Sequence, residues 1–350
     1  MANENWYDLL AQKPMMTSAP CRIDMGGTLD LSTFYLPLRH LNPCTFNLAI
    51  ALRTKVRLSA FKRGWVKVSS RGFKDAEFVM DEVPFRHPMG LIFAIAAYFR
   101  AEGVQIEIDS ASPVRSALGG SSVAAVALIT AFARLRERMG IKRLSRRDTA
   151  LLAHSLEQSV AGVPCGIQDM LAAAFGGANA WQWTGQPGKA PYTKKKVISK
   201  KAHKQLERCL LLAYCGEPHE SIDINGQWVH QFLTGKFRSH WMEIIRATHA
   251  FVGYLKAGDY LRAGGAMNHE TDLRCEMTPA VLDDIGRKLT QAAREKNCGA
   301  RFTGAGGGGC IWALGRPADI KNLKPAWQSI LAEKPRAVLL DTTIDSDGVL

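Results

Sequence analysis

The stretch from Val104 to Ala133 constrains the fold of this chain more than any other. It begins with Val104-Gln-Ile-Glu-Ile108, in which apolar and polar side chains alternate as in a strand with one buried face. It ends with residues 123–133, which are rich in Ala and apolar nearly all round, a pattern that predicts a buried helix. The connecting loop reads Ser112-Pro-Val-Arg-Ser-Ala-Leu-Gly-Gly-Ser-Ser122. We therefore expect a strand, a glycine-containing loop and a buried helix at the centre of the fold.

The loop has the features of a phosphate site. Gly119 and Gly120 lack a Cβ atom, so the backbone can approach an anion closely. Ser121 and Ser122 fall at the helix start, where the first N–H groups have no partner within the helix and the dipole favours negative charge. An N-capped helix after a tight turn would have the same sequence pattern, so the residues of this stretch leave both interpretations open.

Composition indicates a soluble, globular protein. The 350 residues are 47% hydrophobic and 22% charged, which leaves room for two domains and a well-buried core. No apolar run reaches the roughly 18 residues of a membrane-spanning helix, and the polar N-terminus is unlike a signal peptide. The eight cysteines form no CxxC pair and no zinc-like spacing with His, so we expect reduced thiols. Together these features predict a cytoplasmic protein with no membrane partner.

The net charge narrows the choice of partner. The 45 Lys and Arg outnumber the 32 Asp and Glu, which gives +13 and suits nucleic acid, a membrane surface or anionic small molecules. Part of the excess gathers in residues 134–147 and 194–204, and neither segment carries an aromatic RNA-binding pattern or a helix-turn-helix signal. We therefore expect a small-molecule ligand and no nucleic-acid partner.

The rest of the chain alternates strand and helix patterns. A turn-rich stretch at 184–191 predicts a boundary between domains at 1–190 and 191–350. In the first half the patterns predict strands at 45–52, 55–61, 65–69, 77–80 and 178–183, and helices at 88–100, 148–159 and 170–175. In the second half they predict strands at 206–214, 300–303, 310–314 and 337–340, and helices at 221–233, 239–257, 259–267, 278–296 and 317–333.

Near the N-terminus, a strand-like Arg22-Ile-Asp24 runs into Gly26-Gly27, and Thr28 and Asp30 follow. A double glycine beside charged side chains suits a close-fitting polar ligand. A β-turn capped by the Asp is the alternative.

Two carboxylates and a second glycine loop add to the candidates. Glu157 lies near the end of its predicted helix, where the dipole disfavours a negative charge. Asp169 begins an apolar helix, either as a stabilising acid or as a catalytic carboxylate. Gly304-Ala-Gly-Gly-Gly-Gly309 separates two strands, and so flexible a segment persists mainly where backbone must lie close to a ligand or to other chain segments.

Four separated motifs occur in a fixed order. They are Ala19-Pro-Cys-Arg-Ile-Asp-Met-Gly-Gly, Ser116-Ala-Leu-Gly-Gly-Ser-Ser, Gly166-Ile-Gln-Asp-Met-Leu-Ala-Ala-Ala-Phe-Gly-Gly-Ala-Asn and Thr303-Gly-Ala-Gly-Gly-Gly-Gly-Cys. With them the chain resembles the GHMP kinases, and the third motif looks most like the branch of heptose 7-phosphate kinase, fucokinase and galactokinase. The resemblance implies an α+β fold with a ribosomal-protein-S5-like N-terminal domain, a ferredoxin-like C-terminal domain and the active site between them.

The resemblance also implies roles for single residues. Mg²⁺ would be held by Ser121 and Glu157, while Asp169 would orient or deprotonate the acceptor hydroxyl beside Arg22. ATP would contact Arg115, Ser116, Ala117, Leu118, Gly119, Gly120, Ser121 and Ser122, and the acceptor would contact Asp24, Gly26, Gly27, Asp30, Gly306 and Gly307.

This chain departs from the family pattern at several places. Ala117 stands where relatives usually carry Gly, Arg115 where a small residue is common and Met170 where Gln is frequent; the first glycine motif is one residue short.

We expect an ATP- and Mg²⁺-dependent kinase acting on a hydroxyl, the anomeric one, of a sugar or sugar phosphate such as D-glycero-D-manno-heptose 7-phosphate. The alternatives are a galactokinase- or fucokinase-like kinase of an unphosphorylated sugar, a mevalonate-kinase-like kinase of a non-sugar alcohol, and a non-catalytic descendant that binds ligand. The protein could be a monomer or a homodimer.

Overall fold

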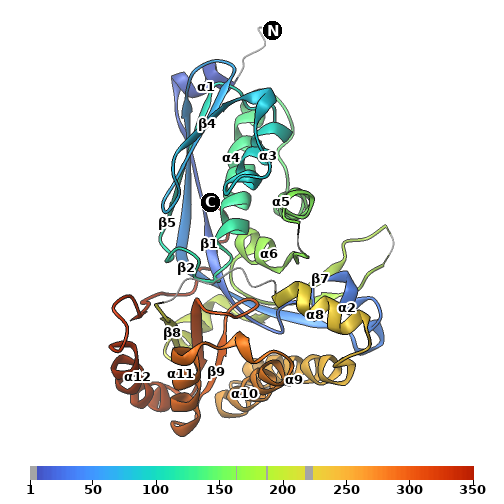
Figure 1. Cartoon of the computed structure of the whole chain (residues 1–350), viewed down its shortest axis with the longest axis vertical. Helices are drawn as coiled ribbons and strands as arrows, with labels where there is room; N and C mark the ends of the chain where they lie inside the picture. The colour runs from blue at the N-terminus through green and yellow to red at the C-terminus, as the bar shows by residue number, and fades with distance from the viewer. Residues whose placement is uncertain (1–5, 163, 187, 217–223) are drawn as a thin grey trace.

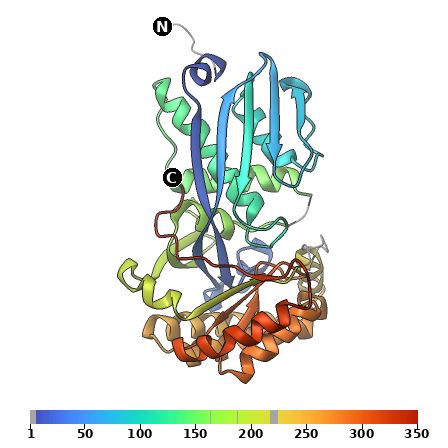
Figure 2. The ribbon, with the colours of Figure 1, turned by 90° about the vertical axis from the view of Figure 1, so that its left-hand side faces the viewer.

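The structure is a computed structural model of the chain and describes residues 6–162, 164–186, 188–216 and 224–350. Two sheets, each with helices packed against it, form the upper and lower parts of the molecule in Figure 1. Figure 2, turned by 90°, shows the long strands of the first sheet running down toward the second. The α+β class predicted from the sequence is confirmed.

Seven strands form the first sheet. They are β1 (Met15–Met25), β2 (Cys44–Ala60), β3 (Trp65–Ser70), β4 (Ala76–Val79), β5 (Val104–Ser110), β6 (Ala178–Trp183) and β7 (Tyr192–Ile198). Their order is β4-β3-β5-β2-β6-β7, with β1 also paired to β2, and all pairs are antiparallel except β3 with β5. In β5 the side chains of Val104, Ile106 and Ile108 are buried and those between them are more exposed, as the alternation predicted.

Helices cover one face of this sheet. They are α1 (Trp6–Gln12), α3 (Gly90–Tyr98), α4 (Gly120–Arg138), α5 (Arg146–Val160) and α6 (Gln168–Phe175). Every residue of α4 from Ser122 to Ala133 is buried, because this stretch carries almost no polar side chain that would need water. Ser145 caps α5, since its hydroxyl accepts a 3.1 Å hydrogen bond from the Asp148 N–H.

The second sheet has four antiparallel strands in the order β11-β8-β10-β9. They are β8 (Leu210–Tyr214), β9 (Gly299–Phe302), β10 (Cys310–Leu314) and β11 (Val338–Leu339). The longer helices of this half are α8 (Ile224–Leu233), α9 (Arg238–Ala257), α10 (Tyr260–Met277), α11 (Asp284–Glu295) and α12 (Pro317–Leu331). Short helices are α2 (Ser32–Tyr35) and α7 (His203–Glu207). Among the described residues no helix is both long and apolar enough to cross a membrane.

The expectation of two strands at 45–52 and 55–61 is wrong, because β2 is one continuous strand of 17 residues. The polar residues in its middle resembled a turn. Arg53 instead donates to the backbone carbonyls of Ser18 and Gly348, each at 2.8 Å, and forms an ion pair with Asp345. These partners come from the two ends of the chain, so local sequence could not predict them.

Some boundaries also differ from those predicted. The turn at 184–191 joins β6 to β7, which are neighbours in the first sheet, so the second sheet starts after it with β8. A division of the chain at 190 into independently folding units stays a prediction. Helix α10 continues to Met277, ten residues beyond its predicted end, and residues 221–223 of a predicted helix lie outside the described residues.

The C-terminal segment ties the two halves together. It leaves β11 in the second sheet and returns to the first, where Ile344 bridges to Ile50. Leu350 then exchanges two backbone hydrogen bonds with Ser18, at 2.8 and 3.0 Å. The wall of the site described below is built from segments of both halves.

Candidate functional site

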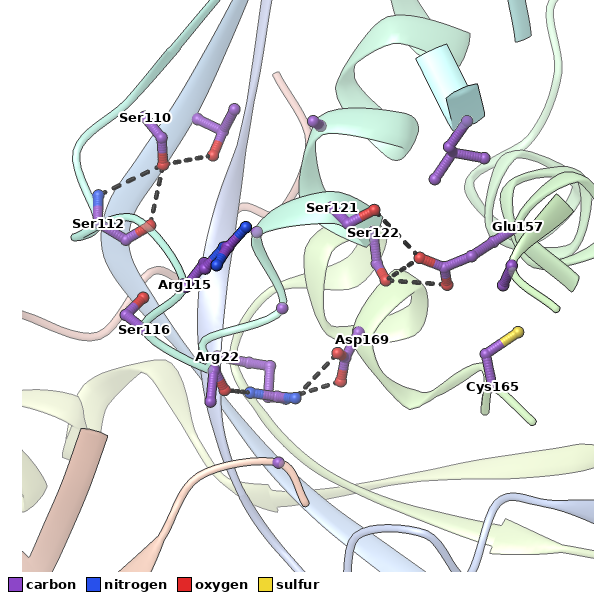
Figure 3. A pocket seen from close by; sticks show the side chains of 18 of the residues that line it. Arg22, Ser110, Ser112, Arg115, Ser116, Ser121, Ser122, Glu157, Cys165 and Asp169 are labelled. Carbon is purple, nitrogen blue, oxygen red and sulfur yellow. Dashed lines mark hydrogen bonds and ion pairs between the residues drawn. The ribbon is translucent and has the colours of Figure 1, made fainter. Parts of the chain in front are cut away.

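A cavity of 540 Å³ lies beside the start of α4. Its lining includes residues of β1, β2, β3 and β5, of the starts of α3, α4, α6 and α8, of the end of α5, and of the glycine loop after β9. Figure 3 shows how Arg22, Asp169, Ser121, Ser122 and Glu157 face one another across it. Residues far apart in the sequence therefore meet at one place.

The loop before α4 leaves the helix N-terminus open. Gly119 occupies the N-cap position with φ of 81°, and no side chain caps the helix. The interpretation as an ordinary side-chain-capped helix is therefore not supported. The first N–H groups of this 19-residue helix adjoin the cavity, where they can bind an anion.

Arg115 and Ala117 of this loop also have positive φ angles, 54° and 59°. Such angles are usual for Gly and cost other residues about 1–2 kcal/mol each. The two positions of this loop at which the sequence departs from the family pattern are thus positions where the backbone favours Gly. Arg115 is exposed, and its side chain lies beside the start of α4 in Figure 3.

The second glycine loop, residues 304–309, packs against the loop before α4. We call that loop, residues 112–122, the phosphate loop after its predicted ligand. A Cβ atom on Gly309 would lie 2.7 Å from the Ser116 carbonyl oxygen and 3.0 Å from the Ala117 Cβ atom. Gly309 also has φ of 87°, so both its space and its conformation exclude a larger residue. We expected the backbone of this segment to lie close to a ligand or to another chain segment. Gly309 lies close to the phosphate loop.

Arg22 and Asp169 form a two-pronged ion pair. Arg22 Nε lies 2.7 Å from Asp169 Oδ1 and Nη2 lies 2.8 Å from Oδ2. The third nitrogen, Nη1, donates to the Ala117 carbonyl at 2.8 Å. Burial raises the pKa of Asp169 and Arg22 opposes that rise, so the ion pair favours the carboxylate form. Arg22 thereby links the carboxylate to the phosphate loop.

Glu157 reaches the opposite side of the loop. Its carboxylate accepts hydrogen bonds from Ser121 Oγ at 3.2 Å and from Ser122 Oγ at 3.2 and 3.3 Å. Burial and the nearby charge of Asp169 raise the pKa of Glu157 to about 7. A cation at this place would stabilise the ionised carboxylate.

These oxygen donors fit a magnesium ion held jointly with a nucleotide. The described residues contain no group of three or more His, Cys, Asp or Glu side chains that could hold a metal without other ligands. A carboxylate with neighbouring hydroxyls suits Mg²⁺, which usually takes one or two carboxylates and completes its shell with water and phosphate oxygens.

Asp30 lines the cavity together with Thr28, Gly166, Gln168 and Asn225. One of its oxygens accepts from the Gln168 N–H at 2.9 Å, and burial raises its pKa to about 7. A Cβ atom on Gly166 would lie 1.7 Å from this carboxylate, so Gly is required there. These residues present hydroxyl, amide and carboxyl groups to a ligand in the cavity.

Several predicted acceptor residues do not line this cavity. Asp24 is fully buried, and its carboxylate accepts from the Gly304 N–H at 2.7 Å and pairs with Arg301 at 3.1 Å. The Gly307 N–H donates to the Val281 carbonyl at 2.9 Å. Acceptor contacts by Asp24, Gly26, Gly27, Gly306 and Gly307 stay predictions that this lining does not favour.

The sequence did not reveal the apolar part of the cavity lining. Apolar side chains of Phe73, Met89, Ile92, Ile108 and Val114 form a slot next to the loop. They come from separate segments with no shared motif, so folding alone brings them together. The slot is suited to a flat, apolar group attached to a phosphate chain.

Two family models match the chain. The model for the N-terminal domain of GHMP kinases matches residues 88–177, which include the phosphate loop, Glu157 and Asp169. The model for the C-terminal part of GHMP kinases matches residues 251–333, which include the glycine loop. The matched segments therefore supply most walls of the cavity.

Two relatives and one solved structure are similar to this chain over most of its length. A mevalonate kinase from Thermococcus sibiricus is 28% identical over 330 residues, which cover 86% of this chain and 89% of the relative. A galactokinase from Thermotoga neapolitana is 23% identical over 278 residues, which cover 72% of this chain and 77% of the relative. The structure of a D-glycero-D-manno-heptose 1-phosphate kinase from Bacteroides thetaiotaomicron matches with a TM-score of 0.72 at 18% identity, over 96% of this chain and 97% of that one.

Proposed function

The chain belongs to the GHMP kinase superfamily, and from this premise we propose that it transfers a phosphoryl group from ATP to a hydroxyl of a small-molecule alcohol. The observation that carries the proposal is the Arg22–Asp169 ion pair beside the uncapped start of α4, with Glu157 across the loop. Phosphoryl transfer needs groups that position the reactants and neutralise charge, and this arrangement contains both kinds.

Each part of the cavity then has a role in the reaction. The N–H groups at the start of α4 bind the phosphates of ATP. The apolar slot beside Phe73 and Ile92 binds its adenine base. Asp169 accepts a hydrogen bond, and finally the proton, from the acceptor hydroxyl, while Arg22 holds the carboxylate in place. Glu157 and Ser121 would hold Mg²⁺, which would neutralise phosphate charge.

For the acceptor, the comparisons favour a non-sugar alcohol over the sugar phosphate that the sequence motif suggested. The mevalonate kinase relative is more similar to this chain than the galactokinase. Asp24, which the resemblance placed at the acceptor, pairs with Arg301 and is not part of the cavity lining. We therefore place a mevalonate-like alcohol first.

A hydroxyl-rich sugar is the second candidate, because one observation favours it. Asp30, Thr28 and Asn225 together line the part of the cavity where we place the acceptor, its acceptor end, and such groups pair well with several neighbouring hydroxyls. A cytoplasmic location and a homodimer stay predictions from the sequence.

An acceptor panel tests the proposal. The full chain with Mg²⁺ and ATP is given mevalonate, galactose, fucose or a heptose 7-phosphate at millimolar concentration, with ADP release and product phosphorus NMR as readouts. We expect one acceptor class to be phosphorylated and this turnover to disappear without Mg²⁺. No turnover with any acceptor, together with tight nucleotide binding by calorimetry, would instead indicate a non-catalytic descendant.

A further inference from the structure

Four buried charged side chains outside the cavity form a continuous chain of ion pairs. Asp24 pairs with Arg301 at 3.1 Å, Arg301 pairs with Glu270 at 2.8 Å, and Glu270 pairs with Arg274 at 2.9 Å. All four side chains are completely buried. Asp24 belongs to β1 of the first half, whereas the other three belong to β9 and α10 of the second. This row of ion pairs therefore links the two halves of the molecule.

The ends of this chain contact parts of the kinase site. Asp24 accepts from the Gly304 N–H of the glycine loop and lies 3.9 Å from Arg22 Nη1. At the other end, Arg274 Nη2 donates to the Gly27 carbonyl at 2.6 Å. The ion pairs thus connect the glycine loop with the turn that leads to the acceptor end of the cavity.

The contact at Gly27 coincides with a strained residue. Thr28 lines the cavity and has φ of 74°, which is unusual for a β-branched side chain and must be held by its surroundings. The Gly27 carbonyl belongs to the peptide plane that this φ angle orients, so the bond from Arg274 holds that plane directly. The Thr28 hydroxyl in turn donates to Asn225 at 3.2 Å.

A contribution to folding stability does not explain well why these four charges are buried. Buried ion pairs often contribute no more than apolar side chains of similar volume would, because each charge loses its water. One nitrogen of Arg274, Nη1, has no hydrogen-bond partner among the residues that the structure describes. Its guanidinium lies 4.6 Å from the ring centres of both Trp228 and Trp241, and this stacking fixes its direction toward Gly27.

We propose that Arg274 and Glu270 are positioning residues, which hold Thr28 in its strained conformation and so shape the acceptor end of the cavity. The inference rests on the proposed kinase function. It assigns these two side chains no contact with substrate, and it predicts that they affect the acceptor more than the nucleotide.

The test compares a double with a single variant. Glu270→Gln/Arg274→Met removes one charge of each sign and leaves an apolar side chain between the two Trp rings. We expect this double variant to raise the acceptor KM by about tenfold or more while the ATP KM changes by less than about twofold. Glu270→Gln leaves Arg301 and Arg274 without their shared carboxylate, so its melting temperature should fall further than that of the double variant.

Asp272→Asn serves as the matched control, because Asp272 is on the same helix but forms an exposed pair with Arg294. It should change neither KM. An unchanged acceptor KM in the folded double variant, or an equal rise in both KM values, would overturn the positioning role.

Hydrogen exchange separates failure of this inference from failure of the proposed function. If the wild type phosphorylates no acceptor, the proposed function fails, and exchange at residues 25–31 still tests the ion-pair chain. We expect faster exchange there in the double variant than in wild type and in Asp272→Asn. Identical exchange in all three proteins would refute the inference whatever the activity.

Discussion

Arg22 contacts both the proposed catalytic base and the loop that is proposed to bind phosphate. It pairs with Asp169 through two nitrogens and donates to the Ala117 carbonyl of the phosphate loop through the third. A guanidinium is suited to this task because its donors lie in one plane and its charge persists at all relevant pH values. Small changes at this residue should therefore disturb the loop and the carboxylate together.

Replacing Asp169 tests the assignment of the base. Asp169→Asn keeps the shape of the side chain but cannot accept the hydroxyl proton, so the phosphorylation rate should fall by at least about 10²-fold. ATP affinity, measured by calorimetry, should change little. The exposed carboxylate of Asp109, replaced in Asp109→Asn, serves as the control. Equal losses of rate and ATP affinity would make Asp169 structural.

Replacing Glu157 tests the proposed magnesium ligand. Glu157→Gln removes the charge that a cation would meet between Ser121 and Ser122, so half-maximal activity should need at least about tenfold more Mg²⁺. Nucleotide binding without Mg²⁺ should be nearly unchanged. An unaltered Mg²⁺ dependence would contradict this assignment, and the exposed Glu137→Gln on α4 is the matched control.

The loop before α4 contains strained backbone at two non-glycine residues. Arg115, Ala117 and Gly119 all have positive φ angles, and Gly alone adopts that conformation freely. The loop keeps its shape because Arg22 holds the Ala117 carbonyl and Gly309 packs against Ser116. Substitutions at these positions should therefore change stability in opposite directions.

Ala117→Gly should stabilise the protein, and Gly119→Ala should destabilise it. The first relieves about 1–2 kcal/mol of left-handed strain, less the entropy that Gly adds to the unfolded chain, for a net gain of about 0.5–1 kcal/mol. The second adds that strain and places a Cβ atom 3.0 Å from Asp169 Oδ2. Urea denaturation of both variants checks the signs, and a loss of stability in Ala117→Gly would refute the strain argument.

At the scale of the whole molecule, the site lies where the two halves of the chain meet. The phosphate loop, Asp169 and Asp30 come from the first half, and Asn225 and Gly304 come from the second. Asp30 is buried in this junction, and its contact with the Gln168 N–H does not offset the loss of water. Its ionisation is therefore coupled to folding.

Asp30 should make stability decrease as pH rises. Its pKa is about 4 in an unfolded chain and about 7 in the folded protein, so the folded state binds the proton more tightly. This contribution is complete below about pH 4 and is lost as pH rises through about 7, a change on the order of 2–4 kcal/mol. Denaturation of the ligand-free protein between pH 4 and 7 should show a smaller decrease in Asp30→Asn than in wild type. Parallel curves would contradict the coupling.

Local patterns in the sequence determined several elements because their causes are local. The apolar run of α4, the alternation in β5 and the Ser145 cap of α5 each depend on residues within a few positions of one another. The motifs around Arg22, Gly119 and Asp169, and the position of Glu157 near a helix end, also identified residues that the fold brings to one cavity.

Tertiary structure decided what depends on contacts between distant residues. Arg53 continues β2 because it meets the C-terminal segment, and Asp24 turns away from the cavity because Arg301 and Gly304 meet it. The apolar slot beside Phe73 and Ile92 has no motif at all. The sequence by itself determined which residues can bind phosphate and which can act as a catalytic base, since those abilities belong to the side chains and the local backbone. Which carboxylate faces an acceptor and which is neutralised by a buried cation was decided only by the packing of the two halves.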